Sequence, residues 1–148
     1  MNSDRFIRFS SLLNNAQKSI ARIKYKKMDS YGLGSAHTLC MRILLDHSED
    51  GITKTELAAL CGVDKAQISR LVGNLLDMKY ISVCNPKRSY RQKYVLTEEG
   101  KRVACDIQKI VVEINEYVSS DIPKEDLDIF YSTFETICER LSNAEEKF

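Results

Sequence analysis

Residues 65 to 74 carry lysine, glutamine, serine, arginine and asparagine side chains, all with hydrogen-bonding groups, and contain no acidic residue. An arginine can pair with O6 and N7 of guanine, and a glutamine or asparagine can pair with N6 and N7 of adenine. An alanine can touch the methyl group of thymine. The plainer interpretation is that these side chains are only the solvated side of an amphipathic helix. The candidate reading residues are Lys65, Ala66, Gln67, Ser69, Arg70 and Asn74.

A second group of cations lies between residues 78 and 97, where the sequence contains basic side chains and no Asp or Glu. The net charge of the chain is only +1, but a local excess of positive charge can attract a polyanion whatever the net charge. A solvated hairpin tip is the alternative interpretation. From this segment and from the start of a helix predicted at 54 to 60, we add as candidate DNA contacts Lys54, Thr55, Lys87, Arg88, Arg91 and Lys93.

Two short helices, predicted at 54 to 60 and from residue 65 onward, position the reading residues. Thr53 can cap the first helix, with Glu56 completing a capping box, and Asp64 can cap the second. Gly62 lies in the connection, where glycine adopts a left-handed conformation without a steric penalty. This spacing is typical of a helix-turn-helix. The side chains predicted to face inward are Leu57, Ala58, Cys61, Val63, Ile68 and Leu71.

An alternating pattern predicts two strands, at 80 to 83 and at 91 to 96, with Asn85 and Pro86 in the turn between them. Thr97 then caps a helix whose first turn is acidic, as the positive end of a helix dipole prefers. The residues expected to share one face of the second strand are Arg91, Lys93 and Val95.

Three longer segments repeat apolar residues at spacings of three and four, which predicts long amphipathic helices. A further helix is predicted at 35 to 47, with Leu39, Ile43 and Leu44 inward. Because a small middle unit has too little surface to cover three long seams, we favour burial against a second copy of the chain over burial within one chain. The seams are Phe6, Phe9, Leu13, Ala16, Ile20 and Ile23; Val103, Ile107, Ile110, Ile114 and Tyr117; and Leu127, Phe130, Phe134, Ile137 and Leu141.

The five cysteines are odd in number and include no C-x-x-C pair, which argues against a disulfide framework or a zinc ribbon. Reduced thiols in a cytosol fit this pattern. We expect four of the five cysteines to be small core residues. Cys84, near the turn between the two predicted strands, should be the most exposed. His37, Cys40 and His47 give only a weak hint of zinc, so no metal or cofactor is expected.

Other classes of protein find little support in the sequence. No apolar run approaches the length of a membrane span and no secretory leader is visible, so a cytoplasmic protein is expected. The sequence shows no phosphate-cradling glycine loop and no nucleophile constellation, which argues against an enzyme.

The order of a long helix, a helix-turn-helix, a basic wing and two long helices resembles the MarR family of bacterial winged-helix transcription regulators. The segments GITKTELAALCGVDKAQISRLVGNLLDMKYI (51 to 81) and YRQKYVLTEEGK (90 to 101) carry the resemblance. It implies a mainly α fold, a winged helix-turn-helix with a two-stranded β wing and long N- and C-terminal dimerisation helices. The implied organisation is one unit over 1 to 148, with a DNA-binding region at 33 to 100 and a dimerisation region at 4 to 30 and 101 to 146.

The resemblance also implies a function, that of a homodimeric repressor on a pseudo-palindromic operator of double-stranded DNA. The reading helices would enter successive major grooves, and in many members a small aromatic or anionic effector releases the DNA. Many members carry an Asp two residues before an Arg at the wing tip, whereas this wing has no acid. Two alternatives on the same fold are a protein-docking module and a regulator that senses cysteine oxidation.

Overall fold

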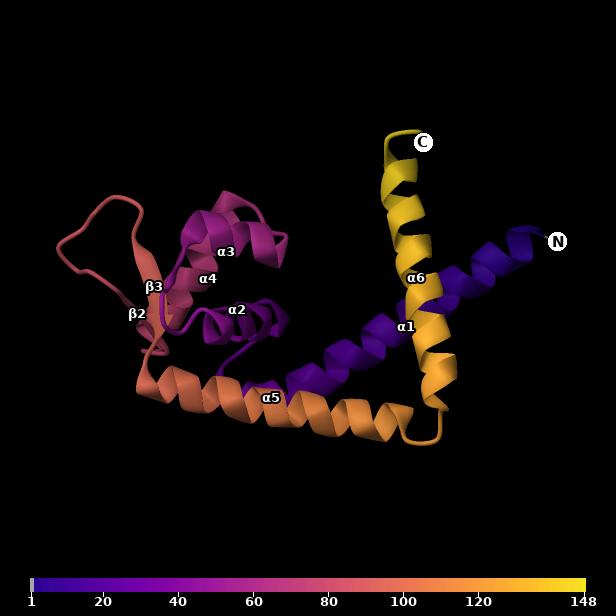
Figure 1. Cartoon of the computed structure of the whole chain (residues 1–148), viewed down its shortest axis with the longest axis horizontal. Helices are drawn as coiled ribbons and strands as arrows, with labels where there is room; N and C mark the ends of the chain where they lie inside the picture. The colour runs from indigo at the N-terminus through magenta and orange to yellow at the C-terminus, as the bar shows by residue number, and fades with distance from the viewer. Residues whose placement is uncertain (1) are drawn as a thin grey trace. The chain divides into compact units, whose positions relative to one another are not determined.

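The computed structural model describes residues 2–148, with side chains described from residue 4 onward. It contains two compact units, one ending at Val111 and one comprising Val112–Phe148. The mainly α, winged architecture predicted from the sequence is confirmed (Figure 1). The elements are α1 (Asn2–Met28), η1 (Asp29–Tyr31), α2 (Ser35–Asp46), β1 (Ile52–Thr53), α3 (Lys54–Cys61), α4 (Lys65–Asp77), β2 (Ile81–Val83), β3 (Lys93–Leu96), α5 (Glu98–Ser119) and α6 (Lys124–Glu145).

The helix-turn-helix forms from the local signals that predict it. The Thr53 hydroxyl accepts from the Glu56 backbone N–H at 3.3 Å, and the Glu56 carboxylate accepts from the Thr53 backbone N–H at 2.9 Å. This reciprocal pair is the capping box of α3. Gly62 then adopts φ of +66° and ends α3, as glycine does without a Cβ penalty. The start of α3 and the turn between α3 and α4 therefore have a defined backbone geometry.

We expect an Asp64→Ala substitution to lower the free energy of unfolding by about 1 kcal/mol, the usual effect of losing a helix N-cap. The Asp64 carboxylate accepts from the Gln67 backbone N–H at 2.7 Å, and alanine leaves that donor without a partner inside the protein. Urea denaturation measures the change. Asp64→Asn keeps a capping oxygen and is the matched control, so equal losses in both variants would contradict this role of the cap.

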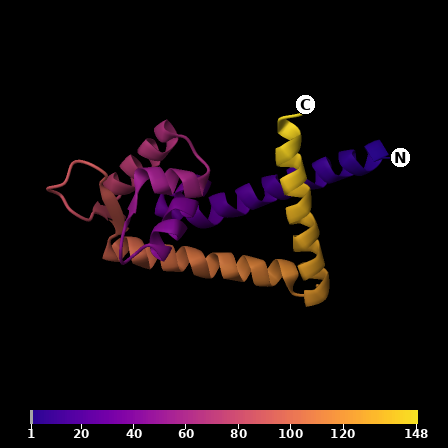
Figure 2. The same ribbon diagram turned by 45° about the horizontal axis from the view of Figure 1, so that its top comes forward.

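The sheet has three antiparallel strands in the order β1-β3-β2. Strands β2 and β3 are the predicted wing strands, with Ile81 opposite Leu96 and Val83 opposite Tyr94. The sequence did not predict β1, since two residues are too short to show an alternating pattern. Figures 1 and 2 show the loop between β2 and β3 extending away from the rest of the first unit.

Arg91 does not share a strand face with Lys93 and Val95, contrary to the sequence prediction. It precedes β3 and has φ of +48°, outside the extended region, so the alternation of side chains is broken before Lys93. Only Lys93 and Val95 alternate with the buried Tyr94 and Leu96 in β3. The Arg91 side chain is thereby free to take a direction that strand geometry would not allow.

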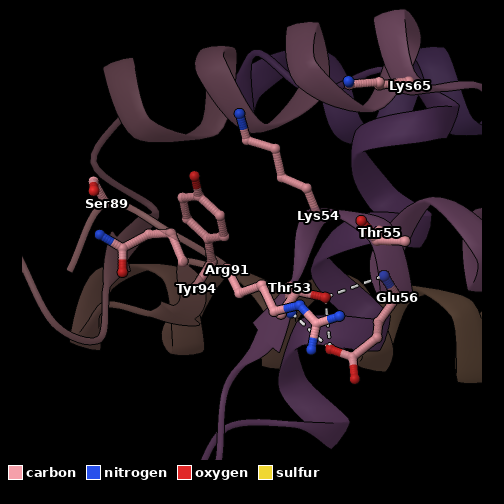
Figure 3. A pocket seen from close by; sticks show the side chains of 9 residues that line it. Thr53, Lys54, Thr55, Glu56, Lys65, Ser89, Arg91 and Tyr94 are labelled. Atoms are coloured by element: carbon pink, nitrogen blue, oxygen red, sulfur yellow. Dashed lines mark hydrogen bonds between the residues drawn. The ribbon is translucent and has the colours of Figure 1, made fainter.

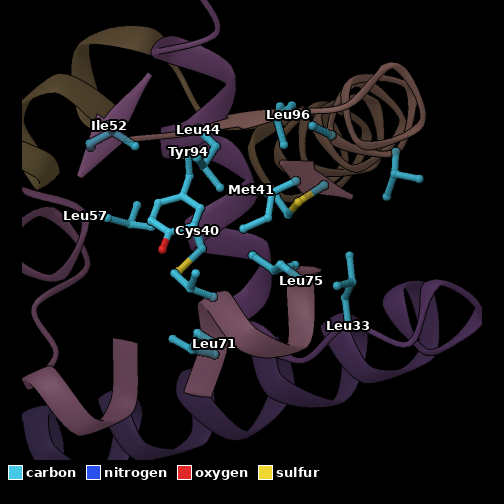
Figure 4. Close-up of a cluster of buried hydrophobic side chains, with 14 of the residues drawn as sticks. Leu33, Cys40, Met41, Leu44, Ile52, Leu57, Leu71, Leu75, Tyr94 and Leu96 are labelled. Carbon is cyan, nitrogen blue, oxygen red and sulfur yellow. The ribbon is translucent and has the colours of Figure 1, made fainter. Parts of the chain in front are cut away.

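The core of the first unit joins α2, α3, α4, the sheet and the first half of α5 (Figure 4). Met41, Leu44 and Leu75 are fully buried in it. Leu57 of α3 and Ile68 of α4 are also buried there, so the predicted inward sides of the helix-turn-helix are confirmed at these positions. This core fixes the reading helix against the sheet that carries the wing.

Leu39 is an exception to the predicted packing of α2. It is 44% exposed, whereas Cys40 and Met41 are fully buried. At 3.6 residues per turn, Leu39 lies about 200° around the helix from Met41, so the two cannot both face the core. Because α2 is apolar on more than one side, periodicity alone selected the wrong residue.

The cysteines are less buried than the sequence suggested. Cys40 is buried and Cys61 is half-buried, but Cys84, Cys105 and Cys138 are exposed. Cys84 was expected to be exposed, whereas the prediction that the other four lie in the core is wrong for two of them. Cys105 follows the buried Ala104 on α5, one step around the helix and away from the core. Cys138 lies on α6, a helix that buries no residue in this chain.

The terminal helices expose many apolar side chains. Phe6 and Ile20 of α1 are 59% and 51% exposed, and Phe130 of α6 is 57% exposed. Tyr117, near the end of α5, is 85% exposed. Among residues 2–148, none of the helices combines the length and the apolar character that a membrane span requires.

Candidate nucleic-acid interface

The reading helix α4 separates its apolar and polar side chains onto opposite sides. Ile68, Leu71, Val72 and Leu75 are buried. The predicted reading residues alternate with them at helical spacing, so they lie on the other side. Those that are fully on the outer surface are Lys65, Ala66, Ser69 and Arg70, with Gln67 half-buried beside them.

Asn74, the last predicted reading residue, is held toward α2. Its side-chain amide lies 3.3 Å from Nε2 of His37. The other ring nitrogen of His37, Nδ1, accepts from the Gly34 backbone N–H at 3.2 Å. Burial lowers the pKa of His37 below its ordinary value of 6.5, so the ring is neutral at physiological pH. Asn74 therefore has a structural contact that the other reading residues lack.

A hollow of about 670 Å³ lies between the start of α3, the start of α4 and the wing (Figure 3). It brings together four of the predicted DNA contacts, Lys54, Thr55, Lys65 and Arg91. Lys87, Arg88 and Lys93 do not line it. The other lining residues were not among the predicted DNA contacts; they are Thr53, Glu56, Ser89, Gln92 and Tyr94.

Three cations line this hollow, against one acid, Glu56. The Lys54 ammonium lies 5.9 Å from the centre of the Tyr94 ring, a distance at which a cation and an aromatic face attract each other. The Glu56 carboxylate is engaged with the backbone N–H and hydroxyl of Thr53. Among the described residues no ion pair joins Glu56 to these cations, and the hollow therefore suits an anion such as phosphate.

We expect Glu56 to titrate below its ordinary value of 4.5, because the Thr53 backbone N–H and then the Thr53 hydroxyl donate to the charged carboxylate and lower its pKa. Since the pKa is lowered by folding, the contribution to stability is present above pH 4.5 and is lost as the pH falls through the lowered value. NMR titration of the Glu56 carboxyl carbon measures the midpoint. Thr53→Ala removes the hydroxyl and keeps the backbone N–H, so the midpoint should move part of the way toward 4.5, and an unchanged midpoint would contradict the contribution of the hydroxyl.

In the wing loop a backbone carbonyl holds Arg88 and an aromatic ring lies beside Arg91, and neither cation is paired with an acid of the loop. The Arg88 side chain donates from Nε to the Tyr90 carbonyl at 2.9 Å. The Arg91 guanidinium lies 5.8 Å from the centre of the Tyr90 ring. The predicted turn is confirmed, with the Arg88 backbone N–H donating to the Asn85 carbonyl at 3.0 Å. Tyr90 is 72% exposed and was not among the site residues predicted from the sequence. The signal that could have identified it is an aromatic residue beside Arg91 in a loop without an acid.

The weak hint of zinc gains no support. Nδ1 of His47 lies 2.9 Å from the Ile43 carbonyl, and both ring nitrogens of His37 have polar neighbours within the protein. No group of three or more potential metal ligands occurs among the described residues.

No family profile matches the sequence. The chain is 22% identical over 132 residues to the HTH-type transcriptional regulator TcaR of Staphylococcus aureus, covering 87% of this chain and 85% of TcaR. A solved complex of S. aureus MepR with DNA superposes with a TM-score of 0.81 at 18% identity, over 90% of this chain and 96% of MepR. The structure of MarR gives a TM-score of 0.69 at 21% identity, over 94% of each chain.

The chain has the MarR-type winged-helix fold. The PcaV regulator of Streptomyces coelicolor shares it, with a TM-score of 0.74 at 16% identity over 90% of this chain and 97% of PcaV. TcaR, MepR and PcaV are transcription regulators. Within the MarR-type fold, α3 and α4 form the helix-turn-helix and the loop between β2 and β3 forms the wing.

Proposed function

We propose that this chain is a cytoplasmic, homodimeric, sequence-specific DNA-binding transcription regulator, a repressor that occupies a pseudo-palindromic operator. One observation carries the proposal. The outer side of α4 presents Lys65, Gln67 and Arg70 beside a hollow lined by Lys54 and Arg91, and no acidic side chain lies on α4 between Lys65 and Asn74. A surface of this kind suits a polyanion that also displays hydrogen-bonding edges, which describes a DNA groove.

The proposed DNA contacts divide by chemistry and position into three groups. Arg70 and Gln67 have the donors and acceptors for base edges in the major groove. Lys54, Lys65 and Arg91 line the hollow and would bind a phosphate of the backbone, which fixes register without carrying sequence information. In the exposed wing loop, Lys87 and Arg88 would reach the minor groove or its flanking phosphates.

The proposed partner of the terminal helices is a second copy of the chain. Apolar side chains of α1 and α6 that would sit in a core remain exposed in one chain, Phe6 and Phe130 among them. Large exposed apolar patches on a soluble protein mark interaction sites. The regions 4 to 30 and 101 to 146 would form this interface, which would place two reading helices about 10 base pairs apart on DNA. Release by a small aromatic or anionic effector is part of the proposal and rests on the family resemblance.

Fluorescence anisotropy tests the proposal with a duplex from upstream of the chain's own gene, a scrambled duplex of equal length, and two salt concentrations. We expect two protomers per duplex and a clear preference for the natural sequence. Affinity should fall steeply with salt, because each phosphate contact releases a counterion on binding. Weak binding that is equal for both duplexes would contradict recognition of that sequence. A flat salt dependence would favour the protein-docking alternative.

A further inference from the structure

Two of the five cysteines lie in contact inside the first unit. Sγ of Cys40 and Sγ of Cys61 are 3.3 Å apart, although the residues are 21 positions apart in the sequence. Cys40 is buried on α2, and Cys61 is the half-buried last residue of α3. Both are free thiols. A disulfide has an S–S distance of about 2.05 Å, so the two sulfur atoms need to approach by only about 1.3 Å.

The surroundings of the pair allow one partner to make this movement. Cys40 is set among fully buried side chains of α2, including Met41 and Leu44, and close-packed cores resist displacement. Cys61 ends α3 and is followed by Gly62, whose Cβ position would meet no atom within 4 Å. Cys61 is half-buried at the end of a helix whereas Cys40 is fully buried, so Cys61 is the less tightly enclosed partner and the approach can come from it.

We propose that Cys40 and Cys61 are a modification site at which a hydroperoxide forms an intramolecular disulfide. In the first step the Cys61 thiolate attacks the distal oxygen of the hydroperoxide, the O–O bond breaks, and an alcohol or water leaves after taking up a proton. Cys61 is then a sulfenic acid. In the second step the Cys40 sulfur attacks the Cys61 sulfur, and hydroxide leaves with the proton of Cys40 as water. The two thiols together lose two electrons, and the hydroperoxide gains them.

The order of the two steps follows from the environment of each thiol. Burial, followed by the contact with Cys61, raises the pKa of Cys40 to about 12, so Cys40 stays protonated at physiological pH. A thiolate is the form that reacts with a peroxide. Cys61, at the more accessible end of the pair, is therefore the residue that meets the oxidant, and Cys40 is the one that resolves the sulfenic acid.

The consequence for DNA rests on the proposed function, whereas the thiol chemistry does not. Cys61 is separated from Lys65, the first residue of α4, only by the turn. A bond that draws the end of α3 toward α2 displaces this turn and changes the position at which the reading helix starts. We expect oxidation to weaken binding to a specific duplex by at least about tenfold.

Mass spectrometry tests the chemistry on the full chain, without DNA. The protein is treated with hydrogen peroxide, alkylated, and cleaved with trypsin, which places Cys40 in the peptide 28 to 42 and Cys61 in the peptide 55 to 65. We expect these two peptides to be joined, in a monomeric chain on a non-reducing gel. Cys61→Ser should leave Cys40 alkylatable, whereas Cys105→Ser, which removes an exposed thiol, should behave as wild type.

Two results of this experiment would overturn the proposal. One is cross-links confined to the exposed Cys84, Cys105 or Cys138. The other is alkylation of Cys40 and Cys61 that is unaffected by peroxide. DNA affinity is then measured before oxidation, after oxidation and after reduction with dithiothreitol. If the reduced protein binds no duplex specifically, the proposed function fails while the cross-link result stands by itself. Equal affinity of the reduced and cross-linked forms would overturn the regulatory part.

Discussion

A Gly100→Ala substitution is expected to lower the free energy of unfolding by about 3 kcal/mol, at the upper end of the usual range for overpacking. A Cβ on residue 100 would overlap the carbonyl oxygen of Tyr80 and lie 2.8 Å from its carbonyl carbon. These are backbone atoms, so no side-chain rotation can relieve the clash. The same carbonyl accepts from the Thr97 backbone N–H at 3.0 Å, and moving it would break the bond that joins the start of α5 to the wing strands.

Gly73→Ala is the matched control, because it also places a methyl group on a helical glycine. Its Cβ would meet no atom within 4 Å, and alanine is favoured over glycine in a helix by about 1 kcal/mol. Urea and thermal denaturation measure both variants. We expect a loss of stability for Gly100→Ala and a small gain for Gly73→Ala. Wild-type stability of Gly100→Ala would show that α5 does not pack against Tyr80 as closely as described.

An Arg70→Ala substitution is expected to reduce affinity for the specific duplex by about ten- to one-hundredfold. Arg70 is exposed on the outer side of α4, and an arginine that pairs with guanine contributes roughly 1 to 3 kcal/mol of discrimination. Binding to a scrambled duplex should change much less, since it depends on phosphate contacts. Anisotropy titrations on both duplexes at one salt concentration measure the difference.

Arg102→Ala is the control for this experiment, because it removes another exposed arginine without touching α4. Arg102 lies on α5, and among the described residues its partner is Glu99, in an exposed ion pair at 3.7 Å that contributes little to stability. We expect wild-type affinity for both duplexes. If Arg70→Ala and Arg102→Ala weaken binding equally on both duplexes, Arg70 acts only through its charge, and α4 does not read bases through it.

The elements that could be predicted from the sequence are those determined by neighbouring residues. The caps at Thr53 and Asp64 and the turn at Gly62 depend on side chains within four positions of one another, so their spacing specifies them. The two wing strands likewise follow from alternation over a few residues. In α2, by contrast, apolar residues occur on several sides, so Leu39 could not be distinguished from Cys40 and Met41 by pattern.

Features that depend on contacts between distant segments could not be predicted from the sequence. The hollow combines residues 53 to 56 and Lys65 with residues 89, 91, 92 and 94. Its position depends on the pairing of β1 with β3, and β1 could not be predicted from the sequence. The contact between Cys40 and Cys61 likewise depends on how α2 packs against α3. The sequence shows that both residues are cysteines, but only the packed core shows that their two sulfur atoms are in contact.

Selection of bound duplexes from a random DNA pool, followed by sequencing, tests the central claim most directly because it requires no knowledge of the operator. If a dimer presents two copies of α4 to successive major grooves, the enriched sequences should form an inverted repeat with half-site centres about 10 base pairs apart. The Arg70→Ala protein should lose that enrichment. No enriched sequence with the wild-type protein, or enrichment of a motif without two-fold symmetry, would contradict a sequence-specific homodimer that reads DNA with α4.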